Sequence, residues 1–133
     1  MEPEMTESLT ANTAATQNSL RSLLEKETLS TSEREDWLRL QRLPNFLEAV
    51  GYLERNRSAI HVRDVEGFWG SAIIDVWKLW EPSIHDVLRP KSDTALLNFE
   101  SLSKKVIRYR ARRLRREEIR NLLRAALPGL PKQ

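Results

Sequence analysis

Apolar residues recur every three or four positions along much of the chain, which is the period of amphipathic helices. The first such stripe comprises Trp37, Leu40, Leu43, Leu47, Val50 and Leu53, widened by Phe46 and Tyr52. Ser32 and Glu35 have the spacing of a capping box, so this helix is predicted to begin near Glu33. Pro44 removes a backbone donor and presses its ring on the preceding turn, so we expect a kink there or two segments that meet at Leu43.

The densest apolar stretch, residues 60–88, has the same helical spacing. Its three tryptophans are Trp69, Trp77 and Trp80. Burial would remove roughly 150 to 250 Å² of each from water, so we place all three in the core. An exposed tryptophan would instead indicate a partner surface. Gly67 and Gly70 indicate a break or a close approach of two helices, and Pro82 predicts a new segment starting near Glu81.

A third pattern runs from an N-cap at Asp93 or Thr94 to about Leu127 without proline or glycine. A straight helix of that length would measure about 51 Å, against roughly 33 Å for a compact domain of this size. The apolar residues of its first part, Ala95, Phe99, Leu102, Val106 and Tyr109, share one face. Those of its last part, Ile119, Leu122, Leu123 and Ala126, share another face, rotated by roughly 130°. We therefore expect either a break between Arg115 and Glu117 or a far end that packs on a different partner.

The N-terminal stretch, residues 1–19, shows no hydrophobic period and is rich in Ser, Thr, Asn and Ala, so burial cannot offset the entropy of ordering it. We expect a disordered tail at 1–19, a single helical domain at 20–127 and a C-terminal tail at 128–133. No strand-like alternation of useful length occurs. The predicted fold is all-α, an irregular bundle of four to five helices with a long or broken basic C-terminal helix.

Composition narrows the class of protein. At 133 residues the chain fits one domain. It has no cysteine, which excludes disulfides and thiolate-metal sites and favours a reducing setting. The acidic N-terminal stretch lacks the apolar region of a signal peptide, and no apolar run reaches the roughly 20 residues of a membrane span. We expect a soluble, cytoplasmic protein.

Charge is unevenly distributed along the chain. Residues 1–103 hold 11 Lys and Arg against 17 Asp and Glu, a net of −6, whereas residues 104–124 hold 10 against 2, a net of +8. Six of these cations fall within an arc of about 120° on a helical projection: Lys104, Lys105, Arg108, Arg112, Arg115 and Arg116. Such a stripe could follow a phosphate backbone, which arginine contacts in bidentate fashion. Glu117 and Glu118 interrupt the run, however, and only Tyr109 adds an aromatic ring, so a solvated or protein-facing helix is the other interpretation.

Other chemistry has little support in the sequence. The candidate metal ligands are His61 with Asp64, and Glu81 with His85 and Asp86. Two ligands on one helix face do not make a metal site, so we expect capping and surface pairing instead. Asp75 should point away from the apolar face. Ser101 and Ser103 have no histidine at a suggestive spacing, and no G-x-S-x-G, P-loop or H-E-x-x-H motif occurs. We expect no catalysis, no cofactor and no small-molecule substrate.

Part of the chain resembles an uncharacterised bacterial family of small helical proteins, known as a domain of unknown function. The resembling elements are Phe46 to Tyr52, Phe68 with Gly70, Trp77 with Trp80 and Pro82, Arg89, and the pair Phe99 and Glu100. They lie within residues 37–106, a little over half of the chain, and Pro44 departs from the smoother helix of the family's pattern. The resemblance implies an all-α fold. Because the family has no assigned activity, it implies no catalytic residue.

Two functions remain open. The leading hypothesis is a non-catalytic protein-interaction or accessory module, because the apolar face of Ile119, Leu122, Leu123 and Ala126 needs a partner, either another protein or a second protomer. The alternative is a nucleic-acid-binding protein that uses the cationic stripe. A membrane surface is disfavoured, because the apolar residues near the stripe are aliphatic and Tyr109 is the sole aromatic anchor.

Overall fold

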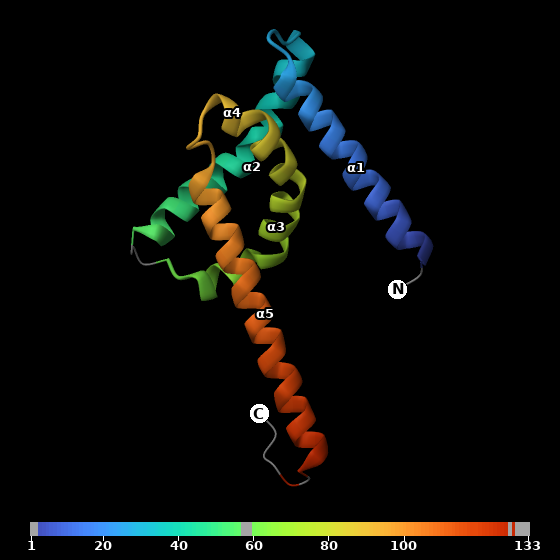
Figure 1. Ribbon diagram of the computed structural model, residues 1–133, viewed down its shortest axis with the longest axis vertical. Helices are drawn as coiled ribbons and strands as arrows, with labels where there is room; N and C mark the ends of the chain where they lie inside the picture. Colours follow the sequence, from blue (N-terminus) through green and yellow to red (C-terminus); the bar gives the residue numbers. More distant parts are fainter. Residues whose placement is uncertain (1–2, 57–59, 128, 130–133) are drawn as a thin grey trace.

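The described part of the protein is a bundle of helices. The computed structural model describes residues 3–56, 60–127 and 129, with side chains from residue 14 onward. In chain order its elements are α1 (Pro3–Glu25), α2 (Thr31–Arg55), α3 (Val62–Ser83), the π-helical turn η1 (Ile84–Leu88), α4 (Arg89–Lys91) and α5 (Leu97–Ala126). None of the described residues forms a strand, which confirms the all-α prediction. Figure 1 shows α2, α3 and α5 around a common centre, with α1 and the second half of α5 extending away from it.

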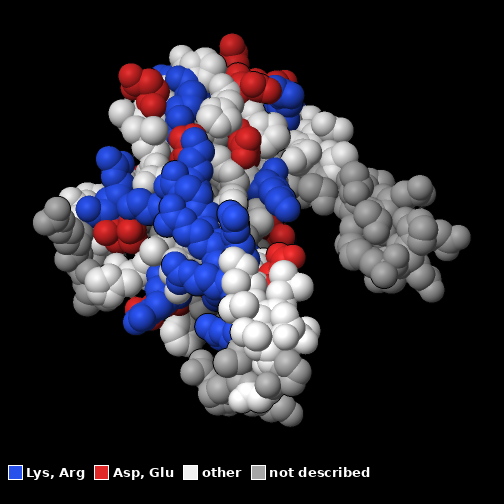
Figure 2. Space-filling model, turned by 60° about the horizontal axis from the view of Figure 1, so that its bottom comes forward, with Lys and Arg blue, Asp and Glu red and all other residues white. Residues whose placement is uncertain are grey.

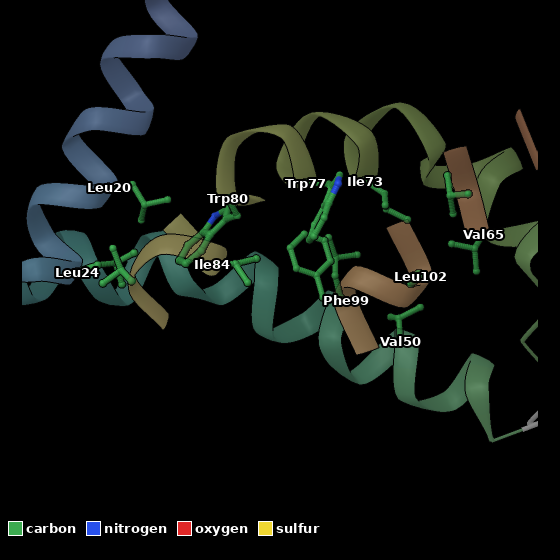
Figure 3. Close-up of a cluster of buried hydrophobic side chains, with 13 residues drawn as sticks. Leu20, Leu24, Val50, Val65, Ile73, Trp77, Trp80, Ile84, Phe99 and Leu102 are labelled. Carbon is green, nitrogen blue, oxygen red and sulfur yellow. The ribbon is translucent and has the colours of Figure 1, made fainter. Parts of the chain in front are cut away.

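The core lies where α3 meets α2 and α5 (Figure 3). Its buried apolar side chains include Leu47 and Val50 from α2, Val65, Ile73, Trp77 and Trp80 from α3, and Phe99, Leu102 and Val106 from α5. The ring of Trp77 meets that of Phe99 edge to face, with ring centroids 5.5 Å apart. At about 25 cal/mol per Å², burial of each buried tryptophan contributes roughly 4 to 6 kcal/mol gross. The core position predicted for Trp69 is wrong, since 48% of this residue is exposed.

Helix α1 covers one end of this core. Leu20 and Leu24 are buried in the core cluster (Figure 3). One turn earlier, the Gln17 side chain donates from Nε2 to the backbone carbonyl of Lys78 at 2.9 Å. Within a helix that carbonyl would accept the amide of residue 82, but Pro82 has no N–H. Helix α1 therefore binds an acceptor that α3 leaves unused.

The start of α1 differs from the disordered tail predicted for residues 1–19, because the helix begins at Pro3. Starting a helix is costly, whereas each residue added to an existing one gains a hydrogen bond. The buried turns around Leu20 and Leu24 supply the start, and a segment that includes several alanines extends it toward the N-terminus. In Figure 1 this N-terminal part of α1 leaves the bundle.

Helix α2 begins two residues before its predicted start. Ser30 is the N-cap: its hydroxyl accepts from the amide of Glu33 at 3.2 Å, and the Glu33 carboxylate accepts from the amide of Ser30 at 3.2 Å. The capping box predicted for Ser32 and Glu35 is therefore wrong. The pair two residues earlier has the same spacing, and an ion pair from Lys26 to Glu33 further stabilises it.

Helix α2 continues through Pro44, so the two segments predicted to meet at Leu43 are not present. An interior proline costs about 3 kcal/mol or more in an isolated helix. Here Pro44 is fully buried and α2 packs along α5, which offsets that cost. Several members of the predicted stripe are nevertheless exposed: Leu43, Phe46, Tyr52 and Leu53.

Helix α3 also runs through a proline. His61 is its N-cap, as expected for a boundary residue. Pro82 lies in its last turn, so the new segment predicted near Glu81 is not present. The backbone then widens into η1, where the amide of Arg89 donates to the carbonyl of Ile84, five residues earlier.

Helix α5 is uninterrupted. It starts at Leu97, later than the N-cap predicted at Asp93 or Thr94, because residues 93–96 form a turn that ends on Leu96 with a φ of 55°. It passes residues 115–117 without a break and measures about 45 Å at 1.5 Å per residue. The predicted C-terminal tail, residues 128–133, lies outside the described residues apart from Gly129.

Candidate functional site

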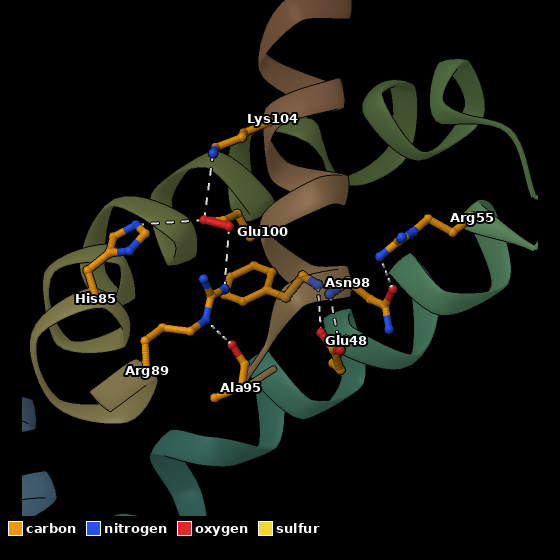
Figure 4. A network of polar contacts seen from close by, with 9 residues as sticks. Glu48, Arg55, His85, Arg89, Ala95, Asn98, Glu100 and Lys104 are labelled. Atoms are coloured by element: carbon orange, nitrogen blue, oxygen red, sulfur yellow. Dashed lines mark hydrogen bonds and ion pairs between the residues drawn. The ribbon is translucent and has the colours of Figure 1, made fainter. Parts of the chain in front are cut away.

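The first turn of α5 is capped by a side chain from another helix (Figure 4). The two carboxylate oxygens of Glu48, on α2, accept from the backbone amides of Asn98 at 3.1 Å and Phe99 at 2.6 Å. The residue at the N-cap of α5 itself, Leu96, contributes no side-chain cap. A carboxylate in this position also complements the positive end of the helix dipole. Helix α2 therefore determines where α5 begins.

A glycine lets the two helices approach closely at the same point. A Cβ added to Gly51 on α2 would lie 2.2 Å from the carbonyl oxygen of Asn98, closer than any real Cβ contact. Four residues further along α2, Arg55 donates from Nη1 to the side-chain oxygen of Asn98 at 3.1 Å. The crossing point of α2 and α5 is thus fixed by backbone packing and by hydrogen bonds.

A second anchor of α5 is the largely buried carboxylate of Glu100 (Figure 4). Its Oε2 accepts from Arg89 Nη2 at 3.3 Å, and Arg89 Nε donates to the carbonyl of Ala95 at 2.7 Å. His85 Nε2 and Lys104 Nζ lie 3.7 and 3.6 Å from Glu100 Oε1. Arg89 therefore ties the turn that precedes α5 to the first turn of the helix.

Further along α5, Glu66 of α3 pairs with the arginines that face the bundle. Its side chain is only 4% exposed, and its Oε1 accepts from Arg113 Nη2 at 2.9 Å and Arg110 Nε at 3.0 Å. The hydrogen bond from Arg113 is the main cause that holds the pKa of Glu66 below its ordinary value, against the opposing effect of burial. The same bond, with a second to Glu117, raises the pKa of Arg113. Gly70 leaves room for Arg110, whose Nη2 would lie 2.6 Å from an added Cβ.

The predicted cationic stripe lies on a different side of α5 from Arg110 and Arg113. In the described part of the chain, some of its cations pair with acidic residues and others do not. Lys105 Nζ lies 2.8 Å from Glu54, and Lys104 lies beside Glu100. The other four members are exposed: Arg108, Arg112, Arg115 and Arg116. Within the described residues none of these four contacts an acidic side chain, and we call them the outward arginines. Figure 2 shows a continuous basic surface along this part of the molecule.

The apolar face predicted near the C-terminus is exposed along its whole length. Leu122 is 63% exposed, Ile119 and Leu123 are each 49% exposed, and Ala126 is exposed as well. We call these four residues the apolar tail face. The structure therefore leaves all four without cover from the described part of the bundle.

A second exposed apolar surface was missed by the sequence reasoning. A groove of about 130 Å³ between α2 and α3 is lined by Leu43, Phe46, Leu47, Trp69, Ala72, Ile73 and Val76. The rings of Phe46 and Trp69 meet edge to face there, with centroids 6.3 Å apart, and the neighbouring Phe68 is 81% exposed. The adjacency of Phe68 and Trp69 in the sequence was a signal for this exposed surface. Consecutive residues of a helix point about 100° apart, so one narrow apolar stripe cannot bury both rings.

The remaining candidate ligands are dispersed. Among the described residues, no group of three or more His, Asp or Glu side chains is placed to hold a metal ion. Asp86 pairs with Arg21 on α1, and Asp75 is exposed, as expected. Ser103 is fully buried in the α5 packing face, and its Oγ has no hydrogen-bond partner in the described structure.

No protein-family model, no curated protein and no solved structure matches the chain. The resemblance to a family of small helical proteins over residues 37–106 therefore stays a prediction. In the part of the chain that the structure describes, no helix combines the length and apolar character needed to cross a bilayer. The two candidate surfaces on α5 are the apolar tail face and the outward arginines.

Proposed function

We propose that the protein is a non-catalytic interaction module, that the second half of α5 is its docking element, and that the partner bound there is a second copy of the chain. The observation that supports this proposal is the exposure of the apolar tail face on a helix that projects from the bundle. A contiguous apolar patch on a protruding element is typical of a protein-binding surface.

The chain's own bundle is poorly placed to cover this face. Helix α5 has no glycine or proline between Leu97 and Ala126, so it has no point at which to fold back. On a helical projection, the side of α5 that packs on the core continues beyond Arg113 as Glu117, Arg120 and Arg124. The apolar tail face is turned roughly 130° away from that polar side. None of the described residues covers it, which favours cover by a partner.

Charge favours an antiparallel pair of α5 helices. The spacing of Ile119, Leu122 and Ala126 forms a seam that a copy of the same helix can meet. In a parallel pair, the next positions along this seam would bring Arg115 and Arg112 against their own copies, which is repulsive. In an antiparallel pair centred on Leu122, Arg112 and Arg115 of each copy lie past Ala126, the last residue of the other copy's α5. The resulting dimer has the two-fold symmetry common among homodimers.

The size of the patch sets the strength of the pairing. Three half-exposed aliphatic side chains and one alanine amount to a few hundred Å² at most, on the order of the largest patch of an ordinary monomer. A stable interface buries about 800 Å² per partner. We therefore expect a weak dimer that forms and dissociates with concentration rather than a permanent one.

Sedimentation velocity from micromolar to millimolar protein tests the pairing. The weight-average mass of the wild type should rise toward that of a dimer as concentration rises. Leu122→Glu places a charge in the seam and should keep the protein monomeric. The matched control is Asn121→Glu, which adds the same charge to the adjacent exposed residue, on another side of α5, and should associate like the wild type.

Two outcomes would overturn the proposal. A wild type that remains monomeric throughout the concentration range excludes self-association through this face. Equal association of the Leu122 and Asn121 variants, both with wild-type far-UV circular dichroism, would show that the contact lies elsewhere on the molecule.

A further inference from the structure

The arginines of α5 are sorted by direction. Arg110 and Arg113 face the bundle, where Glu66 accepts hydrogen bonds from both at 3.0 Å or less. The outward arginines, in contrast, have no acidic contact among the described residues. Because the inward members are neutralised internally, the cationic potential of α5 is concentrated on its outward side.

The dimensions of this side suit a polyanion. From Arg108 to Arg116 the helix rises about 12 Å, a length over which duplex DNA carries about seven phosphate charges at roughly 1.7 Å per charge. The C-terminal half of α5 stands clear of the bundle (Figure 1). A single helix about 10 to 12 Å thick fits a major groove about 12 Å wide. A duplex can therefore reach Arg115 and Arg116 clear of the bundle, whereas Arg108 and Arg112 lie beside Val62 at the start of α3.

A hollow at the base of the stripe adds a shaped contact. It has a volume of about 260 Å³ and is lined by Val62, Lys105, Arg108, Tyr109 and Arg112. Three of these five side chains are cationic, and no acidic residue lines the hollow. Tyr109 supplies a phenol beside the guanidinium groups, which together can hold the oxygen atoms of one phosphate.

The residue types favour phosphate over a lipid surface. Eight of the ten cations in residues 104–124 are arginine, the side chain suited to bidentate phosphate contacts. Within the arc of the stripe, residues 104–116 place no apolar side chain larger than alanine. An interfacial helix needs large apolar residues along the face that it buries in the bilayer. The excess of +8 in residues 104–124 also contrasts with −6 in residues 1–103, so a polyanion is directed to this surface.

We propose that the outward arginines, with Tyr109, bind the phosphate backbone of a nucleic acid duplex. The contact is with backbone phosphates and is independent of base sequence. This inference goes beyond the proposed self-association, because it concerns a different segment of α5 and does not require a dimer.

Fluorescence anisotropy with a labelled duplex DNA of mixed sequence, measured over a salt series, tests the inference. Four phosphate contacts give a slope of about −3.6 for log affinity against log salt, so a fourfold rise in salt should weaken binding about 150-fold. The variant Arg108→Gln, Arg112→Gln, Arg115→Gln removes three contacts. Its slope should fall in magnitude by about 2.7.

A matched variant separates the site from net charge. Arg39→Gln, Arg42→Gln, Lys78→Gln removes three exposed cations from α2 and α3 and lowers net charge equally. It should bind duplex with the wild-type slope. Absence of duplex binding at low salt, or an equal loss in both triple variants, would overturn the inference. Equal affinity for polyglutamate, or for vesicles that contain an anionic phospholipid, would also overturn it, because the partner would then be an acidic protein or a membrane.

Discussion

Two glycines in helix interiors should respond in opposite ways to the same substitution. Gly51 faces the first turn of α5, where an added Cβ would lie 2.2 Å from the carbonyl oxygen of Asn98, whereas a Cβ added to Gly67 has no neighbour within 4 Å. Alanine stabilises an exposed helix interior by about 1 kcal/mol relative to glycine. Gly67→Ala should therefore gain up to about 1 kcal/mol.

Gly51→Ala has the same intrinsic gain but must move a backbone carbonyl of α5. Overpacking of this kind costs about 1 to 3 kcal/mol, and more when backbone must shift. The net change should be a loss of about 1 to 2 kcal/mol, so the two variants should differ by about 2 to 3 kcal/mol. In a domain of this size that difference corresponds to roughly 6 to 15 °C in Tm. Urea unfolding followed by circular dichroism measures both free energies.

A gain in stability for Gly51→Ala equal to that of Gly67→Ala would refute the reasoning. It would mean that α2 and α5 do not approach at Asn98 as described, and that the direction in which α5 leaves the bundle is not set there. A loss in both variants would instead show that α3 is tightly packed around Gly67.

Three further outcomes follow from other contacts. Glu48→Ala should lower the free energy of unfolding by about 2 kcal/mol, because two backbone amides of α5 lose a charged acceptor. The control Glu35→Ala changes an exposed residue of the same helix and should stay within about 0.5 kcal/mol of the wild type, both measured by urea unfolding. The pKa of Glu66 is lowered in the folded state, so its contribution to the free energy of unfolding is present above about pH 4.5 and is lost as pH falls through the folded value. Glu66→Gln should therefore be less stable at neutral pH and should lose less stability than the wild type between about pH 5 and pH 3. An unchanged dependence of stability on pH in this acid range would contradict the prediction. Trp77→Ala should lower the free energy of unfolding by about 3 to 5 kcal/mol, and the loss in Trp69→Ala should be smaller by at least about 2 kcal/mol, because Trp77 is buried and Trp69 is half exposed. Equal losses in the two variants would contradict this difference in burial.

The sequence predicted α2, α3 and α5, but not the first part of α1, because the signals of those three helices are local. Apolar spacing located α2, α3 and α5, and capping-box spacing located the start of α2 to within two residues. It could not choose between Ser30 with Glu33 and Ser32 with Glu35, because both pairs have the same spacing. In the structure Lys26 pairs with Glu33, a contact that favours the first of these two boxes.

The start of α5 depends on contacts that no local pattern contains. Glu48 and Asn98 are 50 residues apart, and the close approach at Gly51 is a property of two packed helices. The same limit applies to the candidate surfaces. Periodicity placed the apolar tail face and the cationic stripe on α5, but only the position of Glu66 shows which arginines have acidic partners.

The contact between Gln17 and the carbonyl of Lys78 has a consequence for variation at these positions. Every amino acid presents the same carbonyl, so position 78 can change side chain freely without loosening α1. Pro82, four residues on, leaves that carbonyl without an intrahelical donor, whereas any other residue there would return an amide to it and the carbonyl would no longer depend on Gln17. One of the contacts that dock α1 thus depends on Pro82 as well as on Gln17.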